Sequence, residues 1–135
     1  MTDKLSEKQR SANMRAVRGR DTKPELCVRK LANSLGYRFR LHRRDLPGNP
    51  DLVFVSRRKV IFVHGCFWHQ HDGCKRATLP QTHAAFWRKK LKGNAVRDAE
   101  IAGRLNREGW GVLTVWECEV RDTDALKARL SAFLR

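Results

Sequence analysis

Acidic residues are scarce in this sequence. Its 135 residues include 14 Asp and Glu against 29 Lys and Arg, which gives a formal net charge of +15 and a sequence pI of about 10.7. This excess of positive charge is larger than solubility requires and is typical of proteins that bind polyanions. The composition therefore predicts DNA or RNA as the partner, with an acidic membrane surface as the rival.

Long apolar stretches are also missing. No segment is apolar over 18 residues, no basic amphipathic helix stands out, and the first 20 residues contain no apolar leader. These absences argue against a membrane protein and predict a cytoplasmic protein whose thiols stay reduced. The four cysteines are therefore interpreted as metal ligands or core residues rather than as disulfides: Cys27, Cys66, Cys74 and Cys118.

Internal repeats and low-complexity tracts are absent as well. The chain length suits one domain with one modest core, which the 41% of apolar residues can fill. Residues 1–20 are polar and basic, and we expect them to form a flexible arm that orders on a partner. Residues 21–135 are expected to form the single folded domain. Nothing in the sequence marks a dimer face, so a monomer is expected.

Hydrophobic periodicity predicts a mixed order of helices and strands. The segment "DTKPEL" has the features of a helix start, with Thr22 as the cap, Pro24 in the first turn and Glu25 three residues after the cap, and Gly36 ends this helix. Apolar runs predict strands over 37–44, 51–55, 59–64 and 110–117. Amphipathic spacing predicts further helices over 83–91, 94–109 and 122–135. This order indicates an α/β domain in which helices flank a mixed sheet.

Potential metal ligands are concentrated in the segment "GCFWHQHDGC". Cys66, His71 and Cys74 follow the spacing C-x4-H-x2-C, and Cys118 at the end of the last expected strand completes a Cys3His set. Four protein ligands leave no open position, so such a site would hold a structural zinc and carry out no chemistry. His69 is an alternative ligand to His71. In the competing interpretation, Cys66 and Cys118 are small buried core residues.

Five titratable residues lie near expected ends of strands and helices, where they could converge on a reaction centre: Glu25, Asp51, His64, His69 and Asp98. Carboxylates in basic surroundings suit Mg2+, which retains water for a phosphate, and a histidine can accept a proton from an attacking water. Each residue also has a plain structural interpretation. Glu25 can complete a capping box, Asp51 can cap a turn, and His64 and Asp98 can be satisfied by neighbours. Spacing alone does not show that the five residues meet.

Several motifs taken together resemble one protein family. The segments "RSANMRAVRGRDTKPEL", "GNPDLVF", "HGCFWHQHDGC", "FWRKKL" and "GWGVLTVWECE" resemble, in that order, the very-short-patch repair (Vsr) DNA mismatch endonucleases, from about residue 9 to residue 120. The resemblance implies a restriction-endonuclease-like three-layer α/β core with a structural zinc site. It implies Mg2+-dependent nicking of one strand 5′ of the thymine in T·G mismatches that arise from 5-methylcytosine deamination. The implied partners are double-stranded DNA with such a mismatch, a cytosine-5 methyltransferase and mismatch-repair proteins.

The resemblance also assigns roles around the expected Mg2+ site. It implies that Asp51 binds Mg2+ and that His69 is the base, with three further residues around the metal and its waters: Glu25, His64 and Asp98. The wider nuclease superfamily has an acidic residue and a lysine, two positions apart, on the strand after this aspartate. This chain has Phe62 and His64 there. A backbone carbonyl, that of Val63, is therefore expected to replace the missing side-chain ligand.

The Cys/His segment receives two roles from the same resemblance. It implies a zinc ion held by Cys66, His71, Cys74 and Cys118, and two rings that enter the base stack, Phe67 and Trp68, with Met14 opposite. Unstacking a base step costs a few kcal/mol, proteins that do so insert apolar wedges, and a mismatched step opens more easily. A zinc-tied loop is expected to hold both rings outward. The alternative is that both rings pack on the zinc or the core.

Two other functions compete with a mismatch-directed nicking endonuclease. One is a zinc-stabilised DNA-binding protein without catalysis, but such a protein needs only a basic face and has no use for the carboxylate and histidine set. The other is a restriction enzyme that cuts intact duplex, which usually requires a two-fold dimer. The nicking endonuclease is therefore the hypothesis that the sequence favours.

Overall fold

The computed structural model of the chain describes residues 21–135. The arm expected over residues 1–20, and Met14 within it, lies outside the described residues. The described helices and strands follow in the order α2 (Lys23–Ser34), β1 (Arg40–Leu41), β2 (Leu52–Phe54), β3 (Lys59–His64), α3 (Ala84–Arg107), β4 (Gly111–Trp116) and α4 (Thr123–Leu134), with short 3-10 turns at Val55–Arg57, Lys75–Ala77 and Glu117–Arg121.

The first described helix begins and ends as its sequence predicts. The Thr22 hydroxyl accepts a hydrogen bond from the Glu25 N–H at 3.4 Å, and Pro24 occupies the first turn. At the other end Gly36 adopts a φ of +86°, in the left-handed region that terminates helices. Val28 is fully buried and lies on the face of α2 that packs against the core. The cap fixes the position of Glu25 in the first turn of α2.

The four strands form one mixed sheet in the order β1-β2-β3-β4. The first three strands are antiparallel neighbours, with Leu52 opposite Ile61, whereas β3 and β4 are parallel, with His64 opposite Trp116. The first strand is much shorter than the expected 37–44, because only two of its residues pair with β2. The sheet is therefore mixed, as the order of elements predicts.

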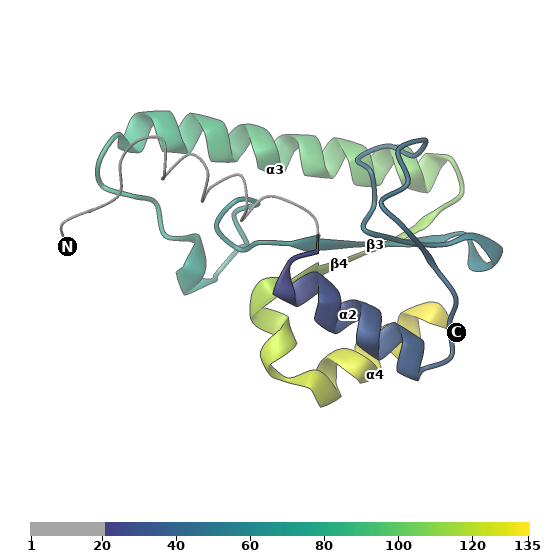
Figure 1. Cartoon of the computed structure of the whole chain (residues 1–135). Helices are drawn as coiled ribbons and strands as arrows, with labels where there is room; N and C mark the ends of the chain where they lie inside the picture. Colours follow the sequence, from purple (N-terminus) through teal and green to yellow (C-terminus); the bar gives the residue numbers. More distant parts are fainter. Residues whose placement is uncertain (1–20) are drawn as a thin grey trace.

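Helices cover both faces of this sheet. Figure 1 shows α3 along one face and α2 with α4 against the other, which gives three layers. Side chains alternate along β3, so that Ile61 packs with α2 and α4 while Val60 packs with the end of α3. The central strands β2 and β3 are mostly buried, because helices cover both faces of the sheet, whereas the edge strand β4 is only partly buried.

The segment between β3 and β4 differs from the sequence-based expectation. The two helices expected over 83–91 and 94–109 are one continuous helix, α3. Gly93 lies inside it, where a glycine costs about 1 kcal/mol relative to alanine but does not end a helix. A Cβ added at Gly93 would meet nothing within 4 Å, so this residue lies on an open surface of the helix. The long helix supplies the crossover that a parallel strand pair requires.

None of the helices described within residues 21–135 is both long enough and apolar enough to span a bilayer.

Gly48 provides a test of how closely the loop before β2 packs on α3. Its φ is +73°, and a Cβ would lie 2.6 Å from Ile101 Cγ2 and 3.2 Å from Phe62 Cε1. We predict that Gly48→Ala lowers the free energy of unfolding by about 1–2 kcal/mol from the left-handed backbone and a further ~1–3 kcal/mol from overpacking. Gly36→Ala, at a φ of +86° with nothing within 4 Å, should show only the first loss. Urea unfolding of both variants measures the difference, and equal losses would contradict the close packing.

Candidate functional site

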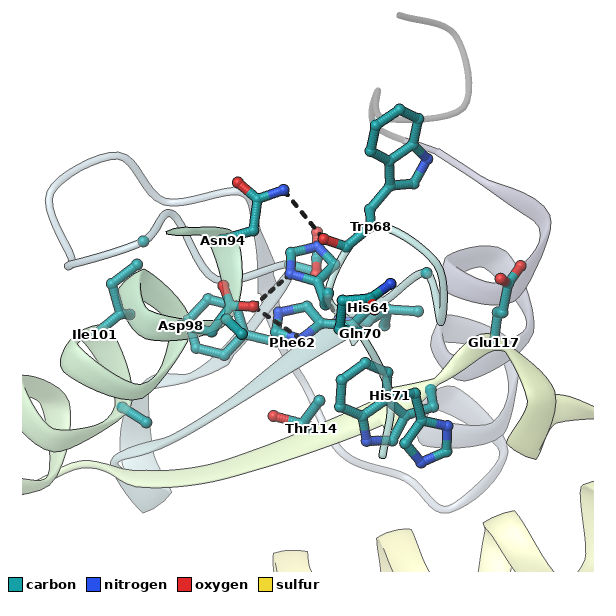
Figure 2. Close-up of a pocket in the computed structure, with 18 of the residues that line it drawn as sticks. Phe62, His64, Trp68, Gln70, His71, Asn94, Asp98, Ile101, Thr114 and Glu117 are labelled. Carbon is teal, nitrogen blue, oxygen red and sulfur yellow. Dashed lines mark hydrogen bonds and ion pairs between the residues drawn. The ribbon is translucent and has the colours of Figure 1, made fainter. Parts of the chain in front are cut away.

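A cavity of about 990 Å³ lies where the carboxyl end of β3, the start of α2 and the inner face of α3 meet (Figure 2). It is lined by all five residues predicted from the sequence to form a reaction centre: Glu25, Asp51, His64, His69 and Asp98. The structure therefore brings these residues together although they come from separate segments of the chain.

Two stacked histidines and one aspartate form one wall of this cavity. The rings of His64 and His69 lie 3.7 Å apart, centroid to centroid, and are parallel within 7°. Asp98 on α3 places Oδ2 at 2.5 Å from His69 Nδ1 and at 4.0 Å from His64 Nδ1 (Figure 2). The carboxylate accepts a hydrogen bond from Nδ1, which leaves Nε2 of a neutral His69 as the acceptor. Burial, and then the nearby His69, lowers the pKa of His64 to about 4, so His64 is neutral near pH 7.

The second wall holds two carboxylates. Asp51 stands directly before β2, and its Oδ2 accepts a hydrogen bond from the Val63 N–H at 2.7 Å. Burial raises the pKa of Asp51 to about 7 in spite of this hydrogen bond, and the nearby Glu25 carboxylate adds to the rise. Glu25 is 2% exposed, and its carboxylate pairs with Arg29 and with His42. Its side chain therefore faces the site, and the capping of α2 is left to Thr22.

The Val63 carbonyl is placed to act beside Asp51. In an extended strand the N–H and C=O of one residue point toward the same neighbouring strand. The N–H and C=O of Val63 therefore both point toward the side of β3 on which Asp51 lies. Extending the β2–β3 register beyond Leu52 puts Pro50 opposite Val63. Proline has no N–H to donate to that carbonyl. The Val63 carbonyl therefore receives no strand hydrogen bond from Pro50. Together with the Asp51 carboxylate it offers the hard oxygen ligands that suit Mg2+.

His42 lies beside both carboxylates of the cavity, and this placement was not predicted from the sequence. Its Nε2 lies 2.9 Å from Glu25 Oε2 and 3.8 Å from Asp51 Oδ1. The sequence offered only a weak signal, a polar residue where the alternating segment "YRFRLHRR" runs into a turn. Neither motif spacing nor periodicity indicates that this turn faces the carboxylates.

Four side chains form a separate cluster beyond the ends of β3 and β4. The ligand atoms of Cys66, His71, Cys74 and Cys118 all lie within 4.8 Å of one another. His71 Nδ1 is 3.6 Å from Cys66 Sγ and 3.4 Å from Cys118 Sγ. A tetrahedral zinc with the usual Zn–S and Zn–N bonds separates its ligand atoms by about 3.5 Å. The donor set and its spacing therefore fit a metal ion, and His71 rather than His69 joins the cysteines.

Trp116 and Glu117 support this cluster, and neither was expected to do so. The Trp116 ring stacks on His71 at 4.2 Å with an angle of 8°, and it meets His64 edge-on at 5.4 Å. Glu117 Oε1 accepts a hydrogen bond from the Cys66 N–H at 3.0 Å. One tryptophan thus contacts both the Cys/His cluster and the stacked histidines of the cavity.

The aromatic residues of the Cys/His loop pack against α3. Phe67 lies 5.1 Å from Trp68 and 5.7 Å from Trp87, and Trp68 lies 6.0 Å from Trp87, between ring centroids. Asn94 on α3 donates a hydrogen bond to the Trp68 carbonyl at 3.0 Å. Phe67 is half-buried and Trp68 is 8% exposed, and the entry of both rings into a base stack stays a prediction. Phe86, which packs on Trp87, is the exposed ring of the group, at 60%.

The surface beside the cavity is basic. Four exposed cationic side chains lie on α3 between residues 88 and 97: Arg88, Lys89, Lys92 and Arg97. Arg97 also lines the cavity. Such a row of cations suits the phosphates of a nucleic acid.

Comparison with known proteins agrees with this chemistry. The family model described as DNA mismatch endonuclease Vsr matches residues 2–76. The chain is 52% identical to "Type II nicking enzyme V.XorIIP" of Xanthomonas oryzae pv. oryzae over 134 residues, which cover 99% of this chain and 98% of that protein. It is 43% identical to "DNA mismatch endonuclease Vsr" of Escherichia coli over 126 residues, 93% of this chain and 80% of that protein. It is 35% identical to "Type II nicking enzyme V.NmeAIP" of Neisseria meningitidis, over 100% and 96% of the two chains.

Proposed function

The chain belongs to the DNA mismatch endonuclease Vsr family and is a DNA endonuclease, and from this premise we propose that it nicks one strand 5′ of the thymine in a T·G mismatch, with Mg2+ as cofactor. The observation that carries the proposal is the convergence of Asp51, Glu25 and the His69–Asp98 pair in one cavity beside a basic helix. The three-layer arrangement suits the restriction-endonuclease-like core that the resemblance implies. A cytosine-5 methyltransferase and mismatch-repair proteins stay predicted partners.

The carboxylate wall suits the binding of Mg2+. Asp51 and the Val63 carbonyl would hold the ion, with Glu25 near its waters. A bound Mg2+ supplies charge for the scissile phosphate and acidifies a water. Asp51 is held in place by the Val63 N–H at 2.7 Å, so the ligand is preorganised. Arg29 and His42 hold Glu25 in the same way.

The histidine wall suits proton transfer. His69 Nε2 is free to accept a proton from an attacking water because Asp98 occupies Nδ1 at 2.5 Å. The Asp98 carboxylate also stabilises the imidazolium that forms, as in other aspartate–histidine pairs. His64, stacked on the same ring, stays neutral and fixes the ring plane of His69.

Nicking assays test these two roles. On a labelled duplex with one T·G mismatch we predict a single Mg2+-dependent nick beside the thymine and much less cutting of T·A. His69→Ala should lower the rate by about 10²–10⁴-fold, because the general base is lost, and Asp51→Ala should lower it at least as far. Both variants should keep their affinity for DNA. The control Asp45→Ala removes an exposed carboxylate that forms an ion pair with Arg43 outside the cavity, and this variant should nick normally.

Other outcomes of the same assay identify the rival functions. Binding without any nick would favour the non-catalytic DNA-binding protein, and a double-strand cut of T·A would favour the restriction enzyme. Wild-type nicking by Asp51→Ala would show that the metal assignment is wrong.

The Cys/His cluster supports a second part of the proposal, a structural zinc. A closed Cys3His site contributes folding free energy, since its ligands come together only in the folded chain. We predict that one equivalent of zinc copurifies with the protein and that Cys118→Ser lowers both the zinc content and the melting temperature. Cys27→Ser, which changes a cysteine of α2 outside the cluster, should leave the zinc content unchanged. Elemental analysis that finds no zinc in the folded, active protein would refute this assignment.

Phe67 and Trp68 remain the proposed wedges, with Met14 opposite. The aromatic cluster with Trp87 supports the idea in one respect, because it presents several rings on the loop and helix that border the cavity. The same packing means that the Trp68 ring must rotate or leave its contact with Trp87 before it can enter a base step.

The double variant Phe67→Ala, Trp68→Ala separates a wedge from a packing role. We predict that nicking at T·G falls by one or more orders of magnitude, because a few kcal/mol of unstacking is no longer offset and about 1.4 kcal/mol corresponds to tenfold. A 2-aminopurine base beside the mismatch should brighten with the wild type and stay dim with the variant. Phe39→Ala, which loses a core ring contact to Phe54 on the opposite face of the sheet, should lower stability and leave the brightening intact. A double variant that is unstable but brightens the probe normally would mean that the rings only pack.

A further inference from the structure

One histidine reaches both carboxylates of the cavity. His42 lies directly after β1, and its ring is 12% exposed. Its Nε2 is 2.9 Å from Glu25 Oε2 and 3.8 Å from Asp51 Oδ1. A single ring nitrogen therefore stands between an acidic residue of α2 and the acidic residue that precedes β2.

The backbone holds His42 in this place independently of its ring. The β1–β2 register, extended by one residue from Leu41 and Leu52, puts His42 opposite Asp51. The His42 N–H donates a hydrogen bond to the Asp51 carbonyl at 3.2 Å. The φ of His42 is +48°, in the left-handed region that a residue with a Cβ adopts only at a cost in backbone energy. Such backbone strain persists where the surroundings fix it, and it is frequent at functional sites.

The ring is a hydrogen-bond donor here. A carboxylate offers only acceptor oxygens, so the nitrogen facing Glu25 must carry the proton of the bond. Arg29 donates to the same Glu25 oxygen from within α2. The Val63 N–H binds Oδ2 of Asp51, which leaves Oδ1 on the side of His42. The His42 ring donates to Glu25, and Asp51 Oδ1 lies beside the same nitrogen at 3.8 Å, beyond hydrogen-bond distance.

We propose that His42 is a positioning residue that sets the separation of the Glu25 and Asp51 carboxylates and thereby the affinity of this cavity for Mg2+. The proposal rests on the proposed function, because it concerns the same metal site. Two buried carboxylates repel each other when no cation lies between them. A donor that binds one carboxylate and lies beside the other lowers the cost of keeping both at the distance that the ion needs, as outer partners of metal ligands do in other sites.

Two substitutions separate the ring from the backbone. His42→Gln keeps an amide nitrogen near the position of Nε2 but tolerates a left-handed φ poorly. His42→Asn tolerates that φ well, because asparagine adopts it more readily than most residues, but its amide reaches only the position of Nδ1. A positioning role of Nε2 therefore favours Gln over Asn, whereas a purely conformational role favours Asn over Gln.

The readout is metal binding as well as activity. Mn2+ serves as the probe, and the loss of its free-ion EPR signal measures binding to the full chain on an uncleaved T·G duplex. We expect His42→Asn to weaken Mn2+ binding by about 10–100-fold and His42→Gln by only a few-fold, in line with the effect of outer-shell partners. The Mg2+ concentration for half-maximal nicking should shift in the same order, and excess Mg2+ should restore the rate of His42→Asn. Melting temperatures of all variants report the backbone effect separately.

Failure of the positioning role and failure of the proposed function give different results. If the wild type binds Mn2+ through Asp51, as shown by loss of binding in Asp51→Ala, while His42→Asn binds equally well, the positioning role is overturned and the proposed function stands. Weaker Mn2+ binding by His42→Gln than by His42→Asn would also overturn the positioning role alone. A wild type that binds no Mn2+ and nicks without Mg2+ overturns both.

Discussion

The parallel pairing of β3 with β4 is the constraint on which the rest of the site depends. Its register sets His64 opposite Trp116 at the carboxyl ends of the two strands. Two residues beyond these ends stand Cys66 and Cys118, which meet in the Cys/His cluster although α3 separates them in sequence. A slip of one residue would turn each side chain to the other face and dismantle both the cluster and the histidine stack. Buried apolar side chains on both faces of β3 make such a slip costly.

The residues beyond these strands form a continuous series of ring contacts. Trp116 stacks on His71 at one side and meets His64 at the other, and His64 stacks on His69. Asp98 then ties the series to α3. The proposed zinc cluster and the proposed base are therefore connected by an unbroken series of ring contacts.

Features that depend on local pattern could be predicted from the sequence. The strand at 59–64 is a continuous apolar run, and the cap at Thr22 depends on residues three apart, so both lie where the sequence places them. The Cys3His set is recognisable because ligand types are rare and closely spaced. Features that depend on long-range placement could not be predicted. His42 faces Glu25 because residue 42 adopts a left-handed conformation directly after β1, and Trp68 contacts Trp87 because α3 returns beside the Cys/His loop.

The break predicted between 91 and 94 is wrong for a related reason. A glycine in a helical pattern weakens the helix locally, but the local pattern does not show how strongly the packing on either side of Gly93 favours one long helix. Leu91 and Leu105 are both fully buried, so the two halves of α3 are each held by the rest of the fold. Tertiary packing therefore outweighs the cost of one glycine.

The distance along the chain between the ligands of the Cys/His cluster bears on how the protein is assembled. His71 and Cys118 are 47 residues apart, and β4 reaches β3 only through the α3 crossover. Closing a span of that length costs chain entropy before any contact compensates for it, whereas β2 and β3 are joined by a short turn and can pair early. We therefore expect the Cys/His cluster, which closes the loop that carries Phe67 and Trp68, to form late in folding. A chain that ends before β4 cannot complete the Cys/His cluster, because Cys118 lies beyond that strand.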